Sequence, residues 1–302
     1  MLPQAILIAG PTASGKSALA LEVVKNIDGV IINADSMQVY HDLRVITARP
    51  SIAEENAAPH YLYGHVDGGD NYSVGRWLAD VTPLLDELKG KRQVPVIVGG
   101  TGLYFKALSE GLSDIPPVPE DVRQQVRQNA EGRETPLLYA DFAVRDPETA
   151  ARISPTDRQR ILRALEVLAA TGRSLASFRS RKKPGPLHKA DVTRLFIAPD
   201  RGELNQKIDA RFMHMMEQGA LAEVERLAAR GLDSTLPLMR SHGTPWLIRH
   251  LQGEIGLDEA IAGAQTDTRH YAKRQLTWFR HQLPDFPWMT RDQAKEHLGL
   301  RR

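Results

Sequence analysis

Residues 10–17 have the composition and spacing of a phosphate-binding loop. They form a complete G-x-x-x-x-G-K-S pattern, made of Gly10, Pro11, Thr12, Ala13, Ser14, Gly15, Lys16 and Ser17. The glycines let backbone N–H groups converge on phosphate oxygens, and Lys16 adds a positive charge. The Ser17 hydroxyl can join the shell of a Mg²⁺ ion. The pattern predicts binding of a phosphate chain, which need not belong to a nucleotide.

Asp35 is the acidic residue best placed to act beside this loop. It follows the apolar run 30–33, so we expect it at the end of a buried strand. A carboxylate there could hold a metal ion. It could also serve as a general base, which contributes roughly 10²- to 10⁴-fold to a rate. The alternative is a residue that only caps a turn.

The segment Gly99 to Tyr104 lacks the acid that a triphosphatase needs. It follows an apolar run that ends at Val98, where a nucleoside triphosphatase often carries a Mg²⁺-binding aspartate. The sequence has Gly-Gly-Thr-Gly instead. For Thr101, a turn residue in a glycine-rich loop is the alternative to a role in the site.

Strands that alternate with helices are expected to hold these loops. Strands are predicted at 5–9, 30–33, 94–98 and 192–198, and helices at 16–24 and 74–88. Parallel strands of this kind bind ligands outside their carboxyl ends. We predict an α/β fold with a P-loop NTPase-like parallel sheet core and an inserted α-helical domain.

The insertion is predicted from a change in the sequence near Gly111. A proline-rich bend at 115–119 leads into charged helical sequence, and a strand pattern returns at Val192. We therefore assign residues 113–189 to the insertion, and 1–112 and 190–302 to the core. Two further core helices are expected at 204–229 and 257–281.

One helix of the insertion is predicted to begin at Ser154 and run to Gly172. Ser154 would be its cap, and Pro155 would occupy the first helical position. The spacing puts Ile161, Leu165 and Leu168 on the buried side. Gln159, Arg160 and Arg163 lie off that stripe.

The composition limits the classes of function. The chain has no cysteine, which excludes disulfides, thiolate zinc sites and thiol nucleophiles and is compatible with a reducing cytoplasm. No apolar run approaches the roughly 20 residues that span a bilayer. The sequence before the glycine-rich loop has no basic leader, so we expect Met1 to be the natural start. We predict a cytoplasmic protein with no membrane partner, by default a monomer.

The charges are unevenly distributed along the chain. Residues 1–110 carry 9 basic and 12 acidic groups (net −3), and the remainder carries 30 and 25 (net +5). The stretch from Arg173 to Arg194 holds seven basic residues against Asp191 alone. Such a stretch suits a polyanion such as RNA, because neutralised phosphates release their counterions. A solvated charged loop is the alternative.

Four segments together resemble a known family. These are GPTASGKS from Gly10, DSMQVY from Asp35, GGTGLY from Gly99, and AKRQLTWFR from Ala272 to Arg280. In this order and over nearly the whole chain, they resemble the tRNA dimethylallyltransferases, also called tRNA isopentenyltransferases. The resemblance implies transfer of a dimethylallyl group from dimethylallyl diphosphate to N6 of adenosine 37 in tRNA, with Mg²⁺ as cofactor. It also implies binding of the anticodon stem-loop.

The resemblance further implies roles for single residues. Asp35 would accept the N6 proton, Thr101 would hydrogen-bond at the diphosphate leaving group, and the loop from Thr12 to Ser17 would hold that diphosphate. The implied tRNA contacts are Asp35, Ser36, Met37, Gln38, Thr101, Arg123, Gln159, Arg160, Ile161, Leu162, Arg163, Arg211, Arg240, Lys273, Arg274, Gln275 and Arg280. For Tyr271 and Trp278 on the last helix, core packing is the favoured interpretation, with base stacking as the alternative.

The chain departs from the family in one block. Many members carry Arg-x-Val/Ile-Gly-Tyr-Arg where this sequence reads Arg240-Ser241-His242-Gly243-Thr244-Pro245. Only the arginine and the glycine match. His242 could stack on a base, although a loop histidine is more often solvated.

Two other functions fit parts of the pattern. A small-molecule kinase also combines a P-loop core with an arginine-bearing helical insertion. The missing strand-end aspartate counts against it. A non-catalytic RNA-binding module is the other, and an intact set of Lys16, Ser17, Asp35 and Thr101 argues against that one.

Overall fold

The computed structural model describes residues 2–179 and 182–300. The predictions for Met1 as a start and for Arg181 in the basic stretch lie outside these residues. The chain forms two compact units, Met1–Ser109 with Pro186–Arg302, and Glu110–Gly185. The sequence-based bounds of the insertion, 113 and 189, lie close to the observed 110 and 185.

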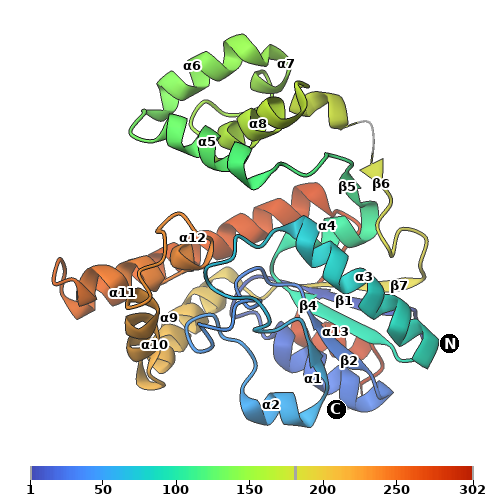
Figure 1. The fold of residues 1–302 in the computed structure, drawn as a ribbon. Helices are drawn as coiled ribbons and strands as arrows, with labels where there is room; N and C mark the ends of the chain where they lie inside the picture. Colours follow the sequence, from blue (N-terminus) through green and yellow to red (C-terminus); the bar gives the residue numbers. More distant parts are fainter. Residues whose placement is uncertain (1, 180–181, 301–302) are drawn as a thin grey trace. The chain divides into compact units, whose positions relative to one another are not determined.

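The first unit is built on a six-stranded parallel sheet (Figure 1). Its strands lie in the order β3-β2-β4-β1-β7-β8. Their bounds are β1 Ala5–Ala9, β2 Val30–Asn33, β3 His60–Tyr61, β4 Pro95–Gly99, β7 Val192–Ile197 and β8 Trp288–Met289. Strand β1 pairs with β4 on one side and β7 on the other, so the loop that follows it lies at the centre of the carboxyl edge.

Helices cover both faces of this sheet. The helices of the first unit are α1 Lys16–Ile27, α2 Ile52–Ala57, α3 Val74–Lys91, α4 Gly102–Glu110, α9 Arg201–Glu217, α10 Ala220–Ala228, η2 Leu238–Arg240, α11 Thr244–Leu251, α12 Leu257–Gln282 and α13 Arg291–His297. Alternate residues of a strand point to opposite faces, so each strand serves two cores. In β1, Ile6 packs with Leu19 of α1, whereas Leu7 shares the other core with Trp77 of α3.

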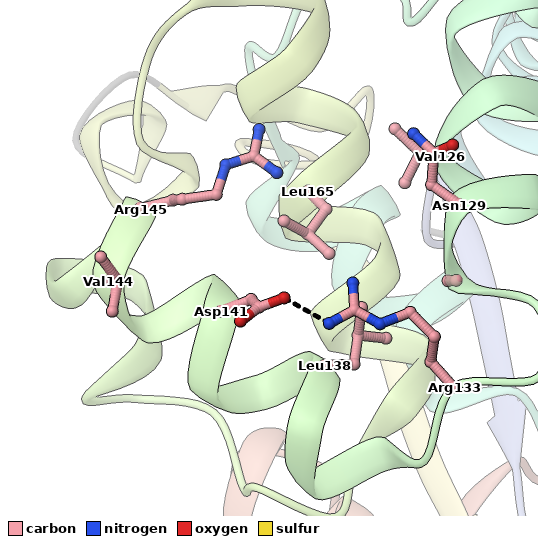
Figure 2. A pocket seen from close by; sticks show the side chains of 9 residues that line it. Val126, Asn129, Arg133, Leu138, Asp141, Val144, Arg145 and Leu165 are labelled. Atoms are coloured by element: carbon pink, nitrogen blue, oxygen red, sulfur yellow. Dashed lines mark hydrogen bonds and ion pairs between the residues drawn. The ribbon is translucent and has the colours of Figure 1, made fainter.

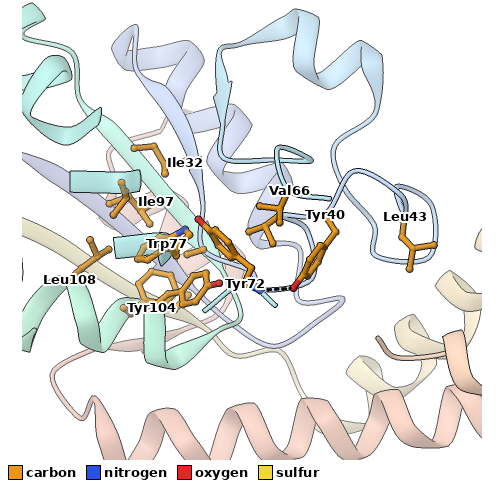
Figure 3. Close-up of a cluster of buried hydrophobic side chains, with 14 of the residues drawn as sticks. Ile32, Tyr40, Leu43, Val66, Tyr72, Trp77, Ile97, Tyr104 and Leu108 are labelled. Atoms are coloured by element: carbon orange, nitrogen blue, oxygen red, sulfur yellow. Dashed lines mark hydrogen bonds between the residues drawn. The ribbon is translucent and has the colours of Figure 1, made fainter. Parts of the chain in front are cut away.

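The larger core holds aromatic side chains under the candidate site. The rings of Trp77 and Tyr104 stack with their centroids 4.2 Å apart, and both side chains are buried (Figure 3). Trp77 Nε1 donates to the carbonyl oxygen of Asn33 at 3.0 Å, at the end of β2. In the same core, the Tyr72 backbone N–H donates to the Tyr40 hydroxyl (Figure 3). These contacts fix where β2 ends and the next loop begins.

The second unit is helical, with a short antiparallel strand pair. Its elements are β5 Leu112–Ser113, α5 Glu120–Ala130, α6 Thr135–Arg145, α7 Pro147–Ala150, α8 Arg158–Thr171, η1 Leu175–Phe178 and β6 Lys182–Lys183. Phe142 and Ile161 are fully buried in its own small core. A unit with its own core can hold its shape without help from the sheet.

Several predicted helix boundaries are wrong. Helices α1 and α3 end at Ile27 and Lys91, each three residues later than predicted. Helix α8 begins after Asp157, whose side chain accepts the Arg160 N–H, while Ser154 opens a turn. The predicted helix 204–229 is two helices, because Gly219 adopts φ +93° between α9 and α10. The end of α8 at Gly172, with φ +65°, agrees with the prediction.

The buried side of α8 also differs in detail from the prediction. Ile161 and Leu165 are buried as expected, whereas Leu168 is half-buried and Val167 is buried instead. Among the helices of residues 2–179 and 182–300, none has the length and apolar composition of a membrane span.

Candidate active site

The phosphate-binding loop joins β1 to α1, as its sequence predicts. Gly15 adopts φ +84° at the start of α1, a conformation that suits glycine and turns backbone N–H groups toward a ligand. Lys16 Nζ donates to the Pro11 carbonyl oxygen at 3.1 Å. Ser14 is buried, and its hydroxyl has no hydrogen-bond partner among the residues described. An unpartnered hydroxyl in this loop is suited to a phosphate oxygen.

The loop after β2 is shaped by the side chain of Asn33, which is fully buried. Its Oδ1 accepts the Asp35 N–H at 2.8 Å, and its Nδ2 donates to the Asp35 carbonyl oxygen at 3.0 Å. The Asp35 carboxylate accepts the Met37 N–H at 2.9 Å through one oxygen. Asp35 is half-buried. Both its backbone and one carboxylate oxygen are therefore held in place.

Thr101 lies against this loop from the end of β4. Its hydroxyl accepts the Ser36 N–H at 2.9 Å, and its own N–H donates to the Ala34 carbonyl oxygen at 3.1 Å. The approach depends on Gly99, since a Cβ there would lie 2.0 Å from the Ala34 carbonyl oxygen. Asp35 and Thr101, separated by 66 positions in the sequence, thus meet at the carboxyl edge of the sheet.

Helix α12 presents three side chains, one turn apart, to these loops. The Tyr271 hydroxyl lies close to Thr101, and the Trp278 ring covers Gly102, where a Cβ would lie 2.1 Å from ring atoms. Gln275 lies between them, accepts the Thr12 N–H at 3.0 Å and donates to the Gly100 carbonyl oxygen at 2.9 Å. Core packing was the favoured interpretation for both rings. The half-buried Trp278 packs against the core, whereas the half-buried Tyr271 packs on His242.

The charges of the site centre on Asp35. Burial lowers the pKa of Lys16 to about 8; the negative charge of Asp35 opposes this shift, and Arg211 of α9 adds to it. Burial also lowers the pKa of Arg211, again with Asp35 acting in the opposite direction. One carboxylate thus faces two cations, and a bound anion would relieve the repulsion between Lys16 and Arg211.

Neutral aromatic side chains surround the same carboxylate. Burial raises the pKa of Tyr63, Tyr104 and Tyr271, and the charge of Asp35 raises each pKa further. These phenols stay protonated at neutral pH, so they can donate hydrogen bonds but do not accept a proton.

His242 is not the solvated loop residue that the sequence favoured. Its ring packs on that of Tyr271 with the centroids 4.1 Å apart, and burial lowers its pKa, with the positive charge of Arg274 adding to the shift. In the divergent block, Thr244 is fully buried and its hydroxyl lies 2.6 Å from that of Ser241. The divergent block therefore supports the candidate site through the contact of His242 with Tyr271.

Two side-chain oxygens at the phosphate-binding loop could serve as ligands for a divalent cation. Ser17 is exposed in the first turn of α1, and Asp35 is the nearby carboxylate. Mg²⁺ commonly takes one or two protein oxygens and completes its shell with phosphate oxygens and water. A second group, His41 with Asp42 and Asp67, lies elsewhere, and Arg230 already pairs with both of its carboxylates.

The predicted tRNA contacts of the insertion differ in exposure. Gln159 and Arg160 are exposed on α8, whereas Ile161 is fully buried and has no side-chain surface to offer RNA. Arg160 pairs with Asp157 at 3.2 Å and Arg163 with Glu166 at 3.6 Å. Two further candidates lie here: Leu162 is half-buried, and Arg123 pairs with Glu120 at 2.8 Å.

A pocket of about 330 Å³ lies in the insertion, away from these predicted contacts (Figure 2). Its floor contains Leu138 and Leu165, and Arg133 and Asp141 form an ion pair beside it (Figure 2). The full lining is Val126, Asn129, Ala130, Arg133, Leu138, Asp141, Val144, Arg145 and Leu165. None of the predicted site residues belongs to this lining.

The remaining predicted contacts lie on the first unit. Lys273, Arg274 and Arg280 are exposed on α12, and Arg240 is exposed at the end of η2. Gln38 donates through Nε2 to the carbonyl oxygens of Thr47 and Ala48 at 2.9 and 2.8 Å, so its amide shapes its own loop. The supporting roles of Asn33, Trp77 and Gln275 were not predicted from the sequence. The one signal for Asn33 is a polar residue at the end of an apolar strand run.

Comparison with known proteins identifies the family. Residues 38–282 match the family described as IPP transferase, and residues 3–63 match isopentenyl transferase. A tRNA dimethylallyltransferase of Methylobacterium nodulans is 62% identical over 295 residues, with 97% of each chain covered. That of Beijerinckia indica is 59% identical, with 96% of each chain covered.

The chain belongs to the tRNA dimethylallyltransferase family. Solved structures of the family share the fold. The tRNA isopentenylpyrophosphate transferase of Staphylococcus epidermidis is 30% identical, with a TM-score of 0.69 over 99% of this chain and 96% of that one. A eukaryotic dimethylallyltransferase acting on tRNA is 27% identical, with a TM-score of 0.80 over 96% of this chain and 75% of that one. These relatives confirm the P-loop NTPase-like fold and do not support the kinase alternative.

Proposed function

We propose that this enzyme transfers the dimethylallyl group of dimethylallyl diphosphate to N6 of adenosine 37 in the anticodon stem-loop of tRNA. The observation that carries the proposal is the grouping of Asp35 with Lys16 of the phosphate-binding loop and with Thr101 at one edge of the sheet. This edge offers a cation-rich cradle for a diphosphate and a carboxylate beside it. Membership of the family supports the same reaction.

In the proposed reaction, a C–N bond forms as a C–O bond breaks. The N6 nitrogen attacks the allylic carbon, the electron pair of the C–O bond leaves with the diphosphate, and the N6 proton passes to the Asp35 carboxylate. Negative charge grows on the leaving group, so Lys16 and the N–H groups of its loop stabilise the transition state more than the bound substrate. We assign the Thr101 hydroxyl to hydrogen bonding at the diphosphate.

A divalent cation fits this arrangement. Bound Mg²⁺ would neutralise part of the charge that develops on the diphosphate. Ser17 and the substrate phosphates would supply its ligands, with Asp35 left as the base. The Ser14 hydroxyl, which is buried without a partner, is proposed as a further donor to phosphate oxygen.

Adenosine 37 must leave the base stack of the anticodon loop to reach Asp35. That costs a few kcal/mol, which contacts elsewhere on the RNA must offset. We propose phosphate contacts from Lys273, Arg274 and Arg280 of the first unit, and from Arg160 and Arg163 of the insertion. Arg211, close to Lys16 and Asp35, would contact substrate at the reacting centre itself.

The experiment uses purified protein, unmodified tRNA, Mg²⁺ and dimethylallyl diphosphate, with ATP in a parallel reaction. Digestion of the RNA and mass spectrometry of its nucleosides should reveal dimethylallyladenosine without ATP. A tRNA with guanosine at position 37 is the matched control and should stay unmodified. Absence of product from the adenosine-containing tRNA, with ATP consumed instead, would overturn the proposal.

A further inference from the structure

Gln275 is buried at the point where the two substrate-binding loops meet. It lies on α12 and is 5% exposed, while its neighbours Lys273 and Arg274 are exposed. Its Oε1 accepts the backbone N–H of Thr12 at 3.0 Å, and its Nε2 donates to the backbone carbonyl oxygen of Gly100 at 2.9 Å. One side chain thus joins the phosphate-binding loop to the residue before Thr101.

Both partners are backbone groups, so the orientation of the amide is determined. An N–H can only donate and a carbonyl oxygen can only accept. A flipped amide would place Nε2 against the Thr12 N–H and Oε1 against the Gly100 carbonyl oxygen, and neither pair can form a hydrogen bond. The Tyr271 hydroxyl lies close to both Thr101 and Gln275. Gly100 allows this approach, because a Cβ there would lie 2.1 Å from Gln275 Nε2.

The side chain of Gln275 bridges the two loops beyond the point where strand pairing holds them together. Strands β1 and β4 are paired up to Ala9 and Gly99, and beyond these residues the two loops leave the ladder. Thr12 belongs to the cradle for the diphosphate, and Gly100 leads into the group formed by Thr101, Ser36 and Asp35. The separation between leaving group and base therefore depends on a side chain from α12.

We infer that Gln275 is a positioning residue, which sets the distance between the phosphate-binding loop and the Asp35–Thr101 pair, and is not a contact for tRNA. The inference rests on the proposed transfer reaction. It replaces the role implied by the resemblance, in which Gln275 touches RNA together with its exposed neighbours. The side chain is 5% exposed, and both its amide oxygen and its amide nitrogen are hydrogen-bonded to the backbone, so little of it is accessible to RNA.

The test compares two variants of Gln275 with a control on the same helix. Gln275→Met keeps the length of the side chain and removes both hydrogen bonds. Gln275→Glu keeps the acceptor for Thr12 and loses the donor for Gly100. Gln282→Met makes the same change at an exposed position near the end of α12. For each protein we would measure kcat, KM for dimethylallyl diphosphate, the inhibition constant of inorganic diphosphate with Mg²⁺, the dissociation constant for tRNA, and the melting temperature.

We expect Gln275→Met to lower kcat roughly 10²-fold, the usual effect of an error of about 1 Å in the position of reacting groups. Its inhibition constant for diphosphate should rise, its affinity for tRNA should stay within about twofold, and Gln275→Glu should behave similarly. Gln282→Met should match the parent protein. If Gln275 acts through the Thr101 loop, adding Thr101→Val to Gln275→Met should lower kcat less than the two separate effects multiplied together.

Three results would overturn the inference. Weaker tRNA binding with kcat unchanged at saturating tRNA would make Gln275 an RNA contact. A lower melting temperature with kcat and diphosphate inhibition unchanged would make its role purely structural. Fully multiplicative effects in the Thr101 double variant would remove the link between the loops. If the parent protein forms no product, the proposed function fails, and binding of inorganic diphosphate to the parent and to Gln275→Met still tests the bridge.

Discussion

Asn33 holds Asp35 through both ends of its side-chain amide. The Oδ1 atom accepts the Asp35 N–H at 2.8 Å and the Nδ2 atom donates to the Asp35 carbonyl oxygen at 3.0 Å. The same Nδ2 also donates to the Leu62 carbonyl oxygen at 3.0 Å, which ties the loop to the segment after β3. The carboxylate can therefore be altered without releasing its backbone.

Asp35→Asn should abolish most of the transfer rate while tRNA stays bound. The amide keeps an oxygen for the Met37 N–H but cannot take up the N6 proton. We expect kcat to fall roughly 10²- to 10⁴-fold, with the dissociation constant for tRNA within about threefold of the parent. Single-turnover kinetics with bound tRNA measure this directly, and Asp28→Asn, in the turn before β2, is the matched control. A normal single-turnover rate would exclude Asp35 as the base.

Binding of inorganic diphosphate should weaken above about pH 8. The free protein has Lys16 with a pKa of about 8, and a bound anion raises that pKa, so binding takes up a proton at alkaline pH. The affinity should be independent of Lys16 titration below pH 8 and fall by up to about tenfold per pH unit above it.

Lys16→Arg provides the control, because guanidinium stays charged over this range. Titration of diphosphate itself affects both proteins equally, so the ratio of the two dissociation constants reports Lys16. Isothermal titration calorimetry at pH values from about 7 to about 9.5 measures the ratio. A ratio that does not change with pH would show that Lys16 is not the titrating group.

Replacing Arg160 and Arg163 by Ala should weaken tRNA binding and reduce its dependence on salt. Each lost phosphate contact lowers the slope of log K against log salt by about 1. Glu166 keeps Arg127 as a partner at 3.3 Å, so the fold of the insertion should be little affected. Arg152→Ala, exposed in the same unit, is the control. An unchanged slope in filter-binding assays would remove both arginines from the RNA surface.

Glu223 should contribute strongly to stability although it is not one of the predicted site residues. Its carboxylate, on α10, accepts the consecutive backbone N–H groups of Arg44, Val45 and Ile46. Glu223→Ala should lower the free energy of unfolding by roughly 2–4 kcal/mol, because buried donors lose a charged acceptor. The exposed Glu225→Ala should change it by less than about 0.5 kcal/mol. Urea unfolding of both variants measures the difference, and equal values would contradict this account.

Features fixed by neighbours in the sequence were predictable. The bounds of β1 and β2 agree with the prediction, since each is a buried apolar run with polar or glycine residues after it. The loop between β1 and α1 was predictable because its sequence pattern lies within residues 10–17. Where two local signals compete, as with Ser154 and Asp157, the sequence does not decide which caps the helix.

Contacts between distant segments could not be predicted. Gln275 is hydrogen-bonded to Thr12, 263 positions away in the sequence, and Glu223 to Arg44, 179 positions away. In the sequence, each is an ordinary polar residue within a helical pattern. Their roles arise only when α10 and α12 pack on the sheet. For the same reason, the sequence suggested candidate substrate-binding residues. It did not suggest the residues that position them.

The position of β1 between β4 and β7 has a consequence for synthesis on the ribosome. Strand β4 emerges before the insertion, and β7 emerges only after it, so one edge of β1 waits unpaired while the whole helical unit is made. The bridge from Gln275 to Thr12 forms later still. The phosphate-binding loop, which is translated first, is thus among the last parts of the candidate site to be completed. Ribosome-bound chains that end before β7 should carry an exposed edge of β1 that chaperones can recognise.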